Sequence, residues 1–470
     1  MQLNSLNLIK NPICMMRYLM LFAVFCSCHW LAECADLGNL LSASPLQSAQ
    51  DETPDSRTDV RAPTRRDADF PINAELVLAN GIGKTSGKYI DLYSDLRDED
   101  TLSDLVKLFD SAVDFWRDYF SISSAKLQGW RAKAMVMVDK SRFLAAGLFP
   151  SDLPDFPAGY QVGDLVWLYV QPGEYYTRHL LLHEGTHAFM WRFLGGLGAP
   201  WYSEGMAEML AIHRWDGGEL LMNYKQARRE ELPYWGRVKL IRDAVAQQKM
   251  LTLEEVMAAE IANFRELNWY AWAWAACLFF DSHPKWSDTF KGLKKYADES
   301  AARTSTRFWR SMRSHHAELN REWSLFIQEL DYGIETERMF VVPAEPAEED
   351  TWTISAERGW HDTGLSIEPG ETIDIVATGR FVIRRDTRTW YSEANGVTVE
   401  YVSGFPLGQL LAAVVQDDGA GIVWLSPQSV GAKASIASES AGKLYLKIND
   451  HPAERGDNEG ALSVRIRVHR

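Results

Sequence analysis

The sequence predicts an α+β protein in which a small mixed sheet and a helical region are followed by an all-β sandwich. Between residues 177 and 332 the apolar residues recur almost throughout with helical spacing. Beyond residue 350 they form short alternating runs separated by Gly, Pro, Asn and Asp, a pattern typical of strands and turns. The chain has 470 residues, 46% of them hydrophobic, which is enough for two or three domains that each bury a core.

The first 35 residues have the features of a secretory signal peptide. Basic residues precede a short apolar run at residues 18–28, and small residues follow it. The run is too short to cross a bilayer as a permanent helix. We therefore expect a secreted, periplasmic or cell-envelope protein with no transmembrane span after signal removal. Lipid attachment at Cys34 is the minor alternative, because Glu33 stands where a lipoprotein cleavage site has a small residue.

Charge and cysteine usage narrow the class of protein further. The formal net charge of −15 opposes a nucleic-acid partner, because phosphate binding requires clustered Lys and Arg. Of the five cysteines only Cys277 lies away from the signal segment, in an apolar stretch, so a disulfide framework is not expected. Residues 36–69 are rich in Ser, Ala, Asp and Pro without apolar periodicity, which predicts a flexible linker.

Residues 70–340 are predicted to form the first folded domain. Strands are expected at 74–78, 89–93, 134–138 and 165–170, and a helix at 102–120. Later helices are expected at 177–194, 203–212, 236–248, 253–261, 270–281 and 321–330. Gly195 is a suitable C-cap for the first of these later helices, and Ser203 a suitable N-cap for the second.

Residues 341–350 contain two prolines and an acidic cluster, which predicts a linker between domains. The strands beyond it are expected at 372–377, 379–383, 398–401, 410–415, 444–448 and 462–468. Residues 351–470 are therefore predicted to form a β-sandwich.

His183 and His187 are the first candidates for a functional site. They are four residues apart in a predicted helix, so both side chains project from one face. Two imidazole nitrogens at this spacing can bind one Zn²⁺ ion. Glu184 follows the first histidine and is placed to act as a general base on a metal-bound water. The alternative is that these are ordinary histidines of a packed helix.

A second acidic motif follows after a glycine-rich turn. The interval between His187 and Glu204 is long enough for one helix to end and a second to return past the metal. Glu204 would then be the third protein ligand, which leaves the fourth position for water. Glu208 lies one turn further along and could accept the N–H of His183 or His187. On the alternative interpretation, Glu204 is a solvent-facing helix residue.

The two motifs, HEGTH at 183–187 and WYSEGMAE at 201–208, resemble those of the gluzincin metallopeptidases of the HExxH superfamily, which include the thermolysin and aminopeptidase N families. The secreted bacterial peptidase MA-like proteins look most similar, over roughly residues 70–332. The resemblance implies a gluzincin domain that acts on peptide or protein substrates. Carried over by position, it implies zinc binding by His183, His187 and Glu204, general-base catalysis by Glu184, and an orienting carboxylate at Glu208.

The resemblance also implies a donor for the oxyanion, usually a Tyr or His from the later helices. Tyr270 precedes an apolar helical stretch, where similar proteins carry a Tyr, and is the first candidate. A Tyr packed at a helix start is the alternative interpretation. His213 and His283 are weaker candidates. An extended peptide is expected to add along the strand at residues 164–170, taken as the edge of the sheet.

Four oxygen-bearing side chains crowd one loop near the end of the chain: Asp450, Glu454, Asp457 and Asn458. Hard oxygen ligands on a loop between strands are what Ca²⁺ requires, and a solvated acidic loop is the alternative. The domain resembles the bacterial calcium-dependent galactose-binding lectins, and this resemblance makes the four residues metal ligands. Because residues 384–408 do not match the sugar-contacting segment of that family, calcium is better implied than galactose.

The leading hypothesis is a secreted zinc metallohydrolase, a peptidase whose water is activated by Glu184, with a C-terminal module for carbohydrate or cell-surface glycan. The alternative is a carbohydrate- or surface-binding protein with a catalytically silent zinc domain. The intact Glu184 argues against that alternative. A third hypothesis is a purely structural helical protein, which would contain no zinc.

Overall fold

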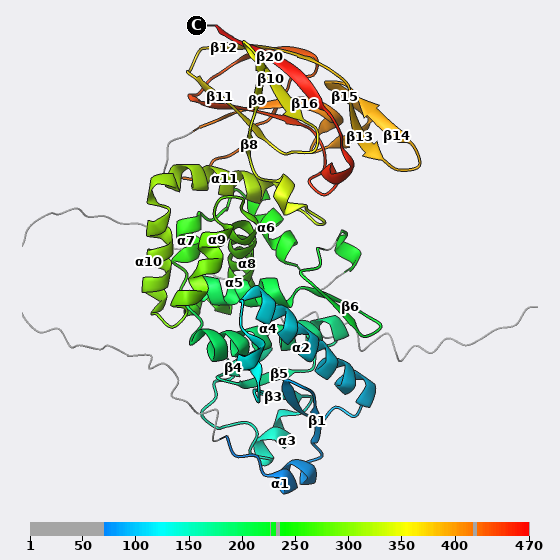
Figure 1. Cartoon of the computed structure of the whole chain (residues 1–470), viewed down its shortest axis with the longest axis vertical. Helices are drawn as coiled ribbons and strands as arrows, with labels where there is room; N and C mark the ends of the chain where they lie inside the picture. The colour runs from blue at the N-terminus through cyan, green and yellow to red at the C-terminus, as the bar shows by residue number, and fades with distance from the viewer. Residues whose placement is uncertain (1–69, 226, 232–235, 417–420, 470) are drawn as a thin grey trace, which may run out of the picture. The chain divides into compact units, whose positions relative to one another are not determined.

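The computed structural model describes residues 70–469 except 226, 232–235 and 417–420. The expected signal peptide and the expected linker at 36–69 lie outside the described residues. The described part has the predicted α+β architecture, with a mixed sheet and helices followed by a β-rich C-terminal region (Figure 1). None of its helices is long and apolar enough to cross a membrane.

The first sheet supports the helix that carries the histidine pair. Its strands are β1 (Gly83–Ser86), β2 (Ile90–Ser94), β3 (Ala132–Met137), β4 (Gly159–Val162) and β5 (Leu165–Tyr169), in the order β1-β2-β3-β5-β4. β2, β3 and β5 are parallel, whereas β1 and β4 are antiparallel to their neighbours. One face shares a hydrophobic core with α2 (Glu99–Tyr119) and α4 (Glu174–Leu194), and the other packs on α1 (Ala74–Ala79) and α3 (Lys140–Ala145).

The edge strands of this sheet are β1 and β4, so the prediction that residues 164–170 form an edge was wrong. β5 is paired on both sides, with β3 and with β4. The chain reverses between β4 and β5 at Gly163, whose φ of 61° suits glycine. The short stretch at 159–162 shows little apolar alternation, and for this reason the sequence pattern did not predict a strand there.

Residues 74–78, predicted as a strand, form the short helix α1 instead. The side chain of Asn73 accepts hydrogen bonds from the backbone N–H groups of Glu75 and Leu76, which satisfies the first turn. Only Val77 is buried, so the apolar run does not form the two-sided contact of an inner strand. A local cap therefore outweighed β-propensity here.

The helical region follows α4 and supplies the second half of the candidate site. Its helices are α5 (Pro200–Ala211), α6 (Arg237–Ala246), α7 (Leu253–Met257), α8 (Leu267–Ser282), α9 (Ser287–Lys291), α10 (Ala301–Ser311) and α11 (His316–Glu329), with a hairpin of β6 (His213–Asp216) and β7 (Glu219–Met222) after α5. α4 ends where predicted, at Gly195 in the left-handed conformation with φ 85°. Ser203, predicted as an N-cap, lies inside α5, because Pro200 suits the first helical position and starts the helix earlier.

The C-terminal region consists of two sheets around a common core. The first has the order β18-β12-β20-β10-β9 and the second β15-β16-β19-β11-β8, with β17 paired to β16. The strands are β8 (Val342–Pro343), β9 (Glu345–Glu348), β10 (Thr351–Ser355), β11 (His361–Ile367), β12 (Thr372–Thr378), β15 (Asn395–Val402), β16 (Phe405–Val415), β17 (Gln428–Ser429), β18 (Lys433–Ala437), β19 (Gly442–Ile448) and β20 (Ala461–His469), besides a hairpin of β13 (Phe381–Arg385) and β14 (Thr389–Ser392).

Residues 341–350, expected to be a linker, are largely part of these sheets. β8 pairs in parallel with β11, and β9 pairs with β10. The prolines are tolerated because both strands lie at sheet edges, where a missing N–H leaves no ladder bond unmade.

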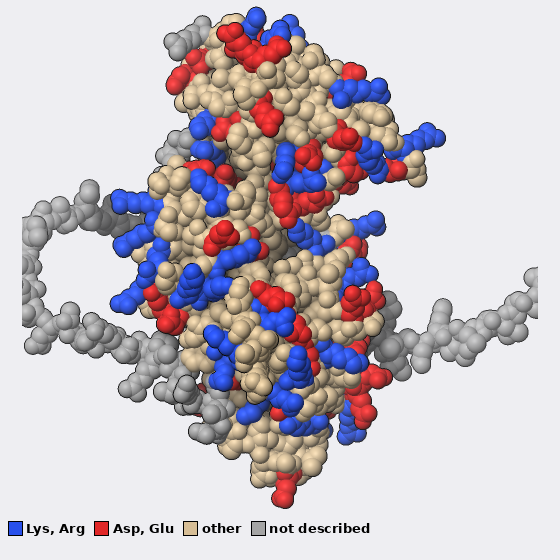
Figure 2. All heavy atoms as spheres, in the orientation of Figure 1, with Lys and Arg blue, Asp and Glu red and all other residues tan. Residues whose placement is uncertain are grey.

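The surface carries both signs of charge. On the face drawn in Figure 2, acidic and basic side chains are interspersed over the helices and the sheets. Many form ion pairs between exposed groups, such as Lys239 with Asp243, and such pairs contribute little to stability.

Candidate metal centre

The centre is built on the buried middle of α4. His183, Glu184 and His187 are all buried there. Gly185 allows the close approach of α2, since a Cβ at this position would lie 2.6 Å from the Phe109 ring and 2.9 Å from that of Trp116. The helix is thereby held against the core, with its histidines facing the next helix.

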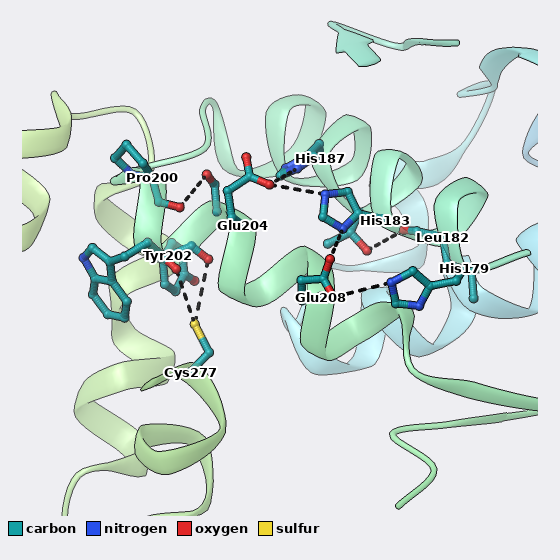
Figure 3. A network of polar contacts seen from close by, with 12 residues as sticks. His179, Leu182, His183, His187, Pro200, Tyr202, Glu204, Glu208 and Cys277 are labelled. Atoms are coloured by element: carbon teal, nitrogen blue, oxygen red, sulfur yellow. Dashed lines mark hydrogen bonds and ion pairs between the residues drawn. The ribbon is translucent and has the colours of Figure 1, made fainter. Parts of the chain in front are cut away.

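The helix α5 brings Glu204 to the two histidines (Figure 3). Oε2 of Glu204 lies 3.3 Å from Nε2 of His183 and 3.4 Å from Nε2 of His187. Ligand atoms about 2.0–2.2 Å from a tetrahedral Zn²⁺ ion are about 3.3–3.5 Å from one another. Both distances from Glu204 therefore match such an ion, and all three donor atoms lie within 4.8 Å of one another, so this group could hold a metal ion.

The electrostatics of the group favour a bound cation. Burial on its own lowers the pKa of His183, but hydrogen bonds to Glu204 and Glu208 override it and raise that pKa to about 10. Burial on its own raises the pKa of Glu204, but the charges of His187 and His183 and their hydrogen bonds bring it down to about 2. The donors thus attract positive charge, and metal binding would have to displace the proton from His183.

Glu184 lies beside the two histidines without taking part in the donor group. Burial raises its pKa, while the charges of His183 and His187 act in the opposite direction. Its carboxylate packs on β4, because a Cβ built on Gly159 would lie 2.5 Å from Oε1 of Glu184. The edge of the first sheet therefore lies directly against this carboxylate.

Glu208 lies one turn beyond Glu204 and meets residues that the sequence did not single out. Its Oε1 is 3.4 Å from Nδ1 of His183, and its Oε2 is 3.5 Å from Nε2 of His179. Arg237 of α6 donates two hydrogen bonds to the same carboxylate. His179 stands four residues before His183, a helical spacing that could have pointed to it, whereas nothing in the sequence pattern indicated Arg237.

Tyr270 lies near these groups, at the start of α8. Its ring centroid is 6.1 Å from that of His183. Burial, followed by the charges of Glu204, Glu184 and Glu208, raises the pKa of its hydroxyl. The hydroxyl therefore keeps its proton at neutral pH and is able to donate a hydrogen bond.

The two weaker histidine candidates have other partners. Nδ1 of His213 lies 2.9 Å from the carbonyl oxygen of Ala211, and the His213 ring stacks on Tyr175. His283 pairs through Nε2 with Glu322 at 2.7 Å. Neither belongs to the donor groups that surround His183 in the described part of the chain.

In the acidic loop of the C-terminal region, some side chains bond one another while other side-chain oxygens have no partner. Nδ2 of Asn458 donates to Oδ2 of Asp450 at 2.8 Å, and both residues are buried. Oδ1 of Asn458 and Oδ1 of Asp457 are buried atoms without a hydrogen-bond partner in the described structure, which fits an oxygen-seeking cation. Burial raises the pKa of Asp450 to about 6. Glu454, with its side chain 53% exposed, instead pairs with Arg384 at 2.9 Å.

No protein-family model matches the chain, and no curated protein matches it. Among solved structures, similarity is found to the EclA N-terminal domain, described as a PllA-like lectin. The match covers 26% of this chain and 100% of that domain, with 20% sequence identity and a TM-score of 0.21. A TM-score this low supports no argument about the chain.

Proposed function

We propose that the chain is a secreted zinc metallohydrolase of the gluzincin type that cleaves peptide bonds. The observation that carries the proposal is the donor group of His183, His187 and Glu204, which could hold a metal ion beside the buried carboxylate of Glu184. When bound, zinc would lower the pKa of a water ligand and polarise the carbonyl of the substrate.

The protein groups have separate tasks in this scheme. Glu184 takes a proton from the attacking water and returns it to the leaving amine, a role that its raised pKa suits. Tyr270 donates a hydrogen bond to the oxyanion that develops on the carbonyl oxygen. Glu208 keeps His183 in the orientation that turns Nε2 toward Glu204.

The position of β4 favours an extended peptide as the substrate. β4 pairs with β5 on one side, and Gly159 places it against the Glu184 carboxylate. A peptide that adds to the free side of an edge strand satisfies its own backbone hydrogen bonds and runs parallel to the protein backbone. Such a peptide would pass beside the proposed base.

The test is peptide-library cleavage by the zinc-loaded full chain and its variants. Glu184→Gln should keep zinc and the fold yet lose at least ~10²-fold in turnover, the usual scale for a general base. His187→Ala should lose zinc. Glu174→Gln, in the exposed first turn of the same helix, is the matched control and should keep both. Full turnover by Glu184→Gln would overturn the assignment, and a zinc-loaded wild type that cleaves no peptide would favour the alternative, a binding protein with a silent zinc domain.

The acidic loop supports a second component of the proposal, a calcium site in the C-terminal region. The supporting observation is the pair of unpartnered buried oxygens on Asp457 and Asn458. Equilibrium dialysis of the zinc-loaded full chain with radioactive Ca²⁺ should detect one site, which Asp450→Asn combined with Asp457→Asn abolishes. Asp350→Asn, in an exposed turn away from this loop, is the control. Equal calcium uptake by the double variant would make the loop an ordinary acidic surface.

A further inference from the structure

Arg237 is a buried cation beside the candidate metal centre with no task in the scheme above. It is the first residue of α6 and is 8% exposed. Its guanidinium donates from Nε to Oε2 of Glu208 at 2.9 Å and from Nη2 to Oε1 at 2.8 Å. A bidentate pair of this kind fixes both the position and the plane of a carboxylate. The orientation of Glu208 is therefore set from α6.

Glu208 in turn faces two imidazoles of α4 (Figure 3). Its Oε1 is 3.4 Å from Nδ1 of His183, and its Oε2 is 3.5 Å from Nε2 of His179. The opposite nitrogen of His183 is the one that faces Glu204. A series of contacts thus leads from Arg237 through Glu208 to a candidate zinc ligand. The partner of the second ring nitrogen commonly orients a histidine ligand in this way.

The same contacts bear on a second group that could hold an ion. His179, His183 and Glu208 also have the spacing of metal ligands. Both oxygens of Glu208, however, already accept hydrogen bonds from Arg237. A metal ion in this group would lie against the guanidinium charge, in a buried place where like charges repel strongly. The guanidinium charge therefore opposes the binding of a second cation by this group.

Arg237 also contacts the candidate oxyanion donor. Its guanidinium carbon lies 5.6 Å from the centre of the Tyr270 ring. A cation at this distance over an aromatic face is attracted to it. The cation that fixes Glu208 therefore also restrains the ring of Tyr270.

We propose that Arg237 is a positioning residue of the metal centre. It fixes Glu208 and through it the zinc ligand His183, it restrains Tyr270, and its charge opposes the binding of a second metal ion. The proposal rests on the proposed zinc-dependent function, and its test includes zinc retention, which is measured without catalysis.

The test compares three variants of the zinc-loaded full chain. Arg237→Gln removes both the charge and the bidentate hydrogen bonds to Glu208. Arg237→Lys keeps the charge but cannot form the bidentate pair. Arg242→Gln is the matched control, because Arg242 lies on the same helix but is exposed and pairs with Asp331 at 2.6 Å. Zinc release to a chromogenic chelator should be about 10–100-fold faster in Arg237→Gln, the scale expected when the support of a ligand is lost. The kcat of Arg237→Gln should fall with little change in KM. Arg237→Lys should have a zinc release rate and a kcat between those of Arg237→Gln and wild type, and the control should match wild type in both.

Two results would overturn the proposal. One is zinc release and kcat within about twofold of wild type in the folded Arg237 variants, far from the expected range. The other is a second tightly bound zinc in the wild type that disappears in His179→Ala. If Arg237→Gln does not fold, Arg237→Lys decides the first point. Failure of the proposed function would give a different result from failure of the Arg237 proposal. In that case the wild type would bind no zinc, or Glu184→Gln would keep full turnover.

Discussion

Three carboxylates surround the histidine pair, and each is specialised by what it faces. Glu204 faces the Nε2 atoms of both histidines, which lower its pKa to about 2 despite its burial. Glu208 faces Arg237, whose charge offsets burial and keeps the pKa of that carboxyl well below its usual range. Glu184 forms no ion pair with Lys or Arg in the described part of the chain, and burial raises its pKa although the charges of His183 and His187 oppose this. In the proposed mechanism the same functional group thus serves as a ligand in Glu204, an orienting group in Glu208 and a base in Glu184.

At this scale we predict a specific effect of Gly159→Ala. The new Cβ would lie 2.5 Å from Oε1 of Glu184, so the carboxylate must move while the proposed zinc donors stay in place. Peptide turnover should fall by about 10–10²-fold with zinc content unchanged, because a small displacement of a reacting group is costly. Gly83→Ala, in strand β1, is the control, since its nearest contact would be an ordinary 3.8 Å. Unchanged turnover in Gly159→Ala would show that the contact between β4 and Glu184 does not affect the reaction.

Tyr270→Phe should act on the transition state and not on binding. The raised pKa of Tyr270 keeps its hydroxyl protonated, and loss of one oxyanion donor typically lowers kcat by about 10²-fold. Steady-state kinetics should show that fall with little change in KM. Tyr224→Phe, whose hydroxyl instead bonds Glu231, should have wild-type constants. A wild-type kcat in Tyr270→Phe would leave Tyr270 as a packing residue.

At the scale of elements, the site depends on how closely α5 packs on α8. Gly205, which follows Glu204, lies against the backbone of α8, where a Cβ would be 2.3 Å from the carbonyl oxygen of Ala273 and 2.5 Å from Sγ of Cys277. No side chain fits into this contact. Because Gly205 has no side chain, α5 can bury one face against α8 while its other face presents Glu204 and Glu208 to α4.

Gly205→Ala is therefore expected to destabilise the protein although alanine is the better helix former. The helix-propensity gain is at most about 1 kcal/mol, whereas overpacking a close contact costs about 1–3 kcal/mol. The rigid backbone of α8 places the cost at the upper end, and zinc affinity should fall because Glu204 shifts. Denaturant unfolding and zinc titration check both effects. Gly292→Ala, where a Cβ meets nothing within 4 Å, is the control; equal stability of the two variants would show that α5 and α8 are not tightly apposed.

At the scale of the whole molecule, a buried ion pair joins α11 to the C-terminal sheets. Glu329 bonds the amino group of Lys447, and its other oxygen accepts from Arg455 at 2.8 Å. Burial opposes ionisation of Glu329, but the charges of Arg455 and Lys447 lower its pKa to about 2. The apolar residues Leu325 and Trp360 pack around the same contact. Charged and apolar contacts therefore both join α11 to the C-terminal region.

This pair predicts a pH-dependent loss of stability. The folded pKa of Glu329 is about 2, below the usual 4.5. Its stabilisation is therefore complete above about pH 4.5, the unfolded pKa, and is lost as pH falls through about 2. Glu329→Gln should lower the free energy of unfolding by about 3–5 kcal/mol at neutral pH, and by progressively less below pH 4.5.

Urea unfolding at several pH values measures the difference. Glu318→Gln breaks a partly exposed pair with Lys285 and should cost less than about 1 kcal/mol at every pH. A Glu329→Gln penalty that does not shrink in acid would show that the pair does not set the pKa of this carboxylate.

Much of the fold follows from local patterns in the sequence. The α+β organisation and the helix around His183 were predictable because the apolar period is set by the geometry of a single element. The errors lie where a few polar contacts decide. A side-chain cap made residues 74–78 a helix, and pairing at a sheet edge made strands of residues 341–350. α10 was not predicted, because it buries only Thr304 and Phe308 and so has a short apolar stripe.

The sequence by itself determined which residues could form a metal site. Helical geometry puts His183 and His187 one turn apart on a common face, and Glu204 and Glu208 likewise, wherever the two helices lie. Only the tertiary structure decided that Glu204 meets both histidines, that Arg237 comes from α6 to hold Glu208, and that Gly159 brings an edge strand to Glu184. The physical reason is that spacing along the chain dictates direction within one helix, whereas the meeting of side chains from separate elements depends on packing across the whole core.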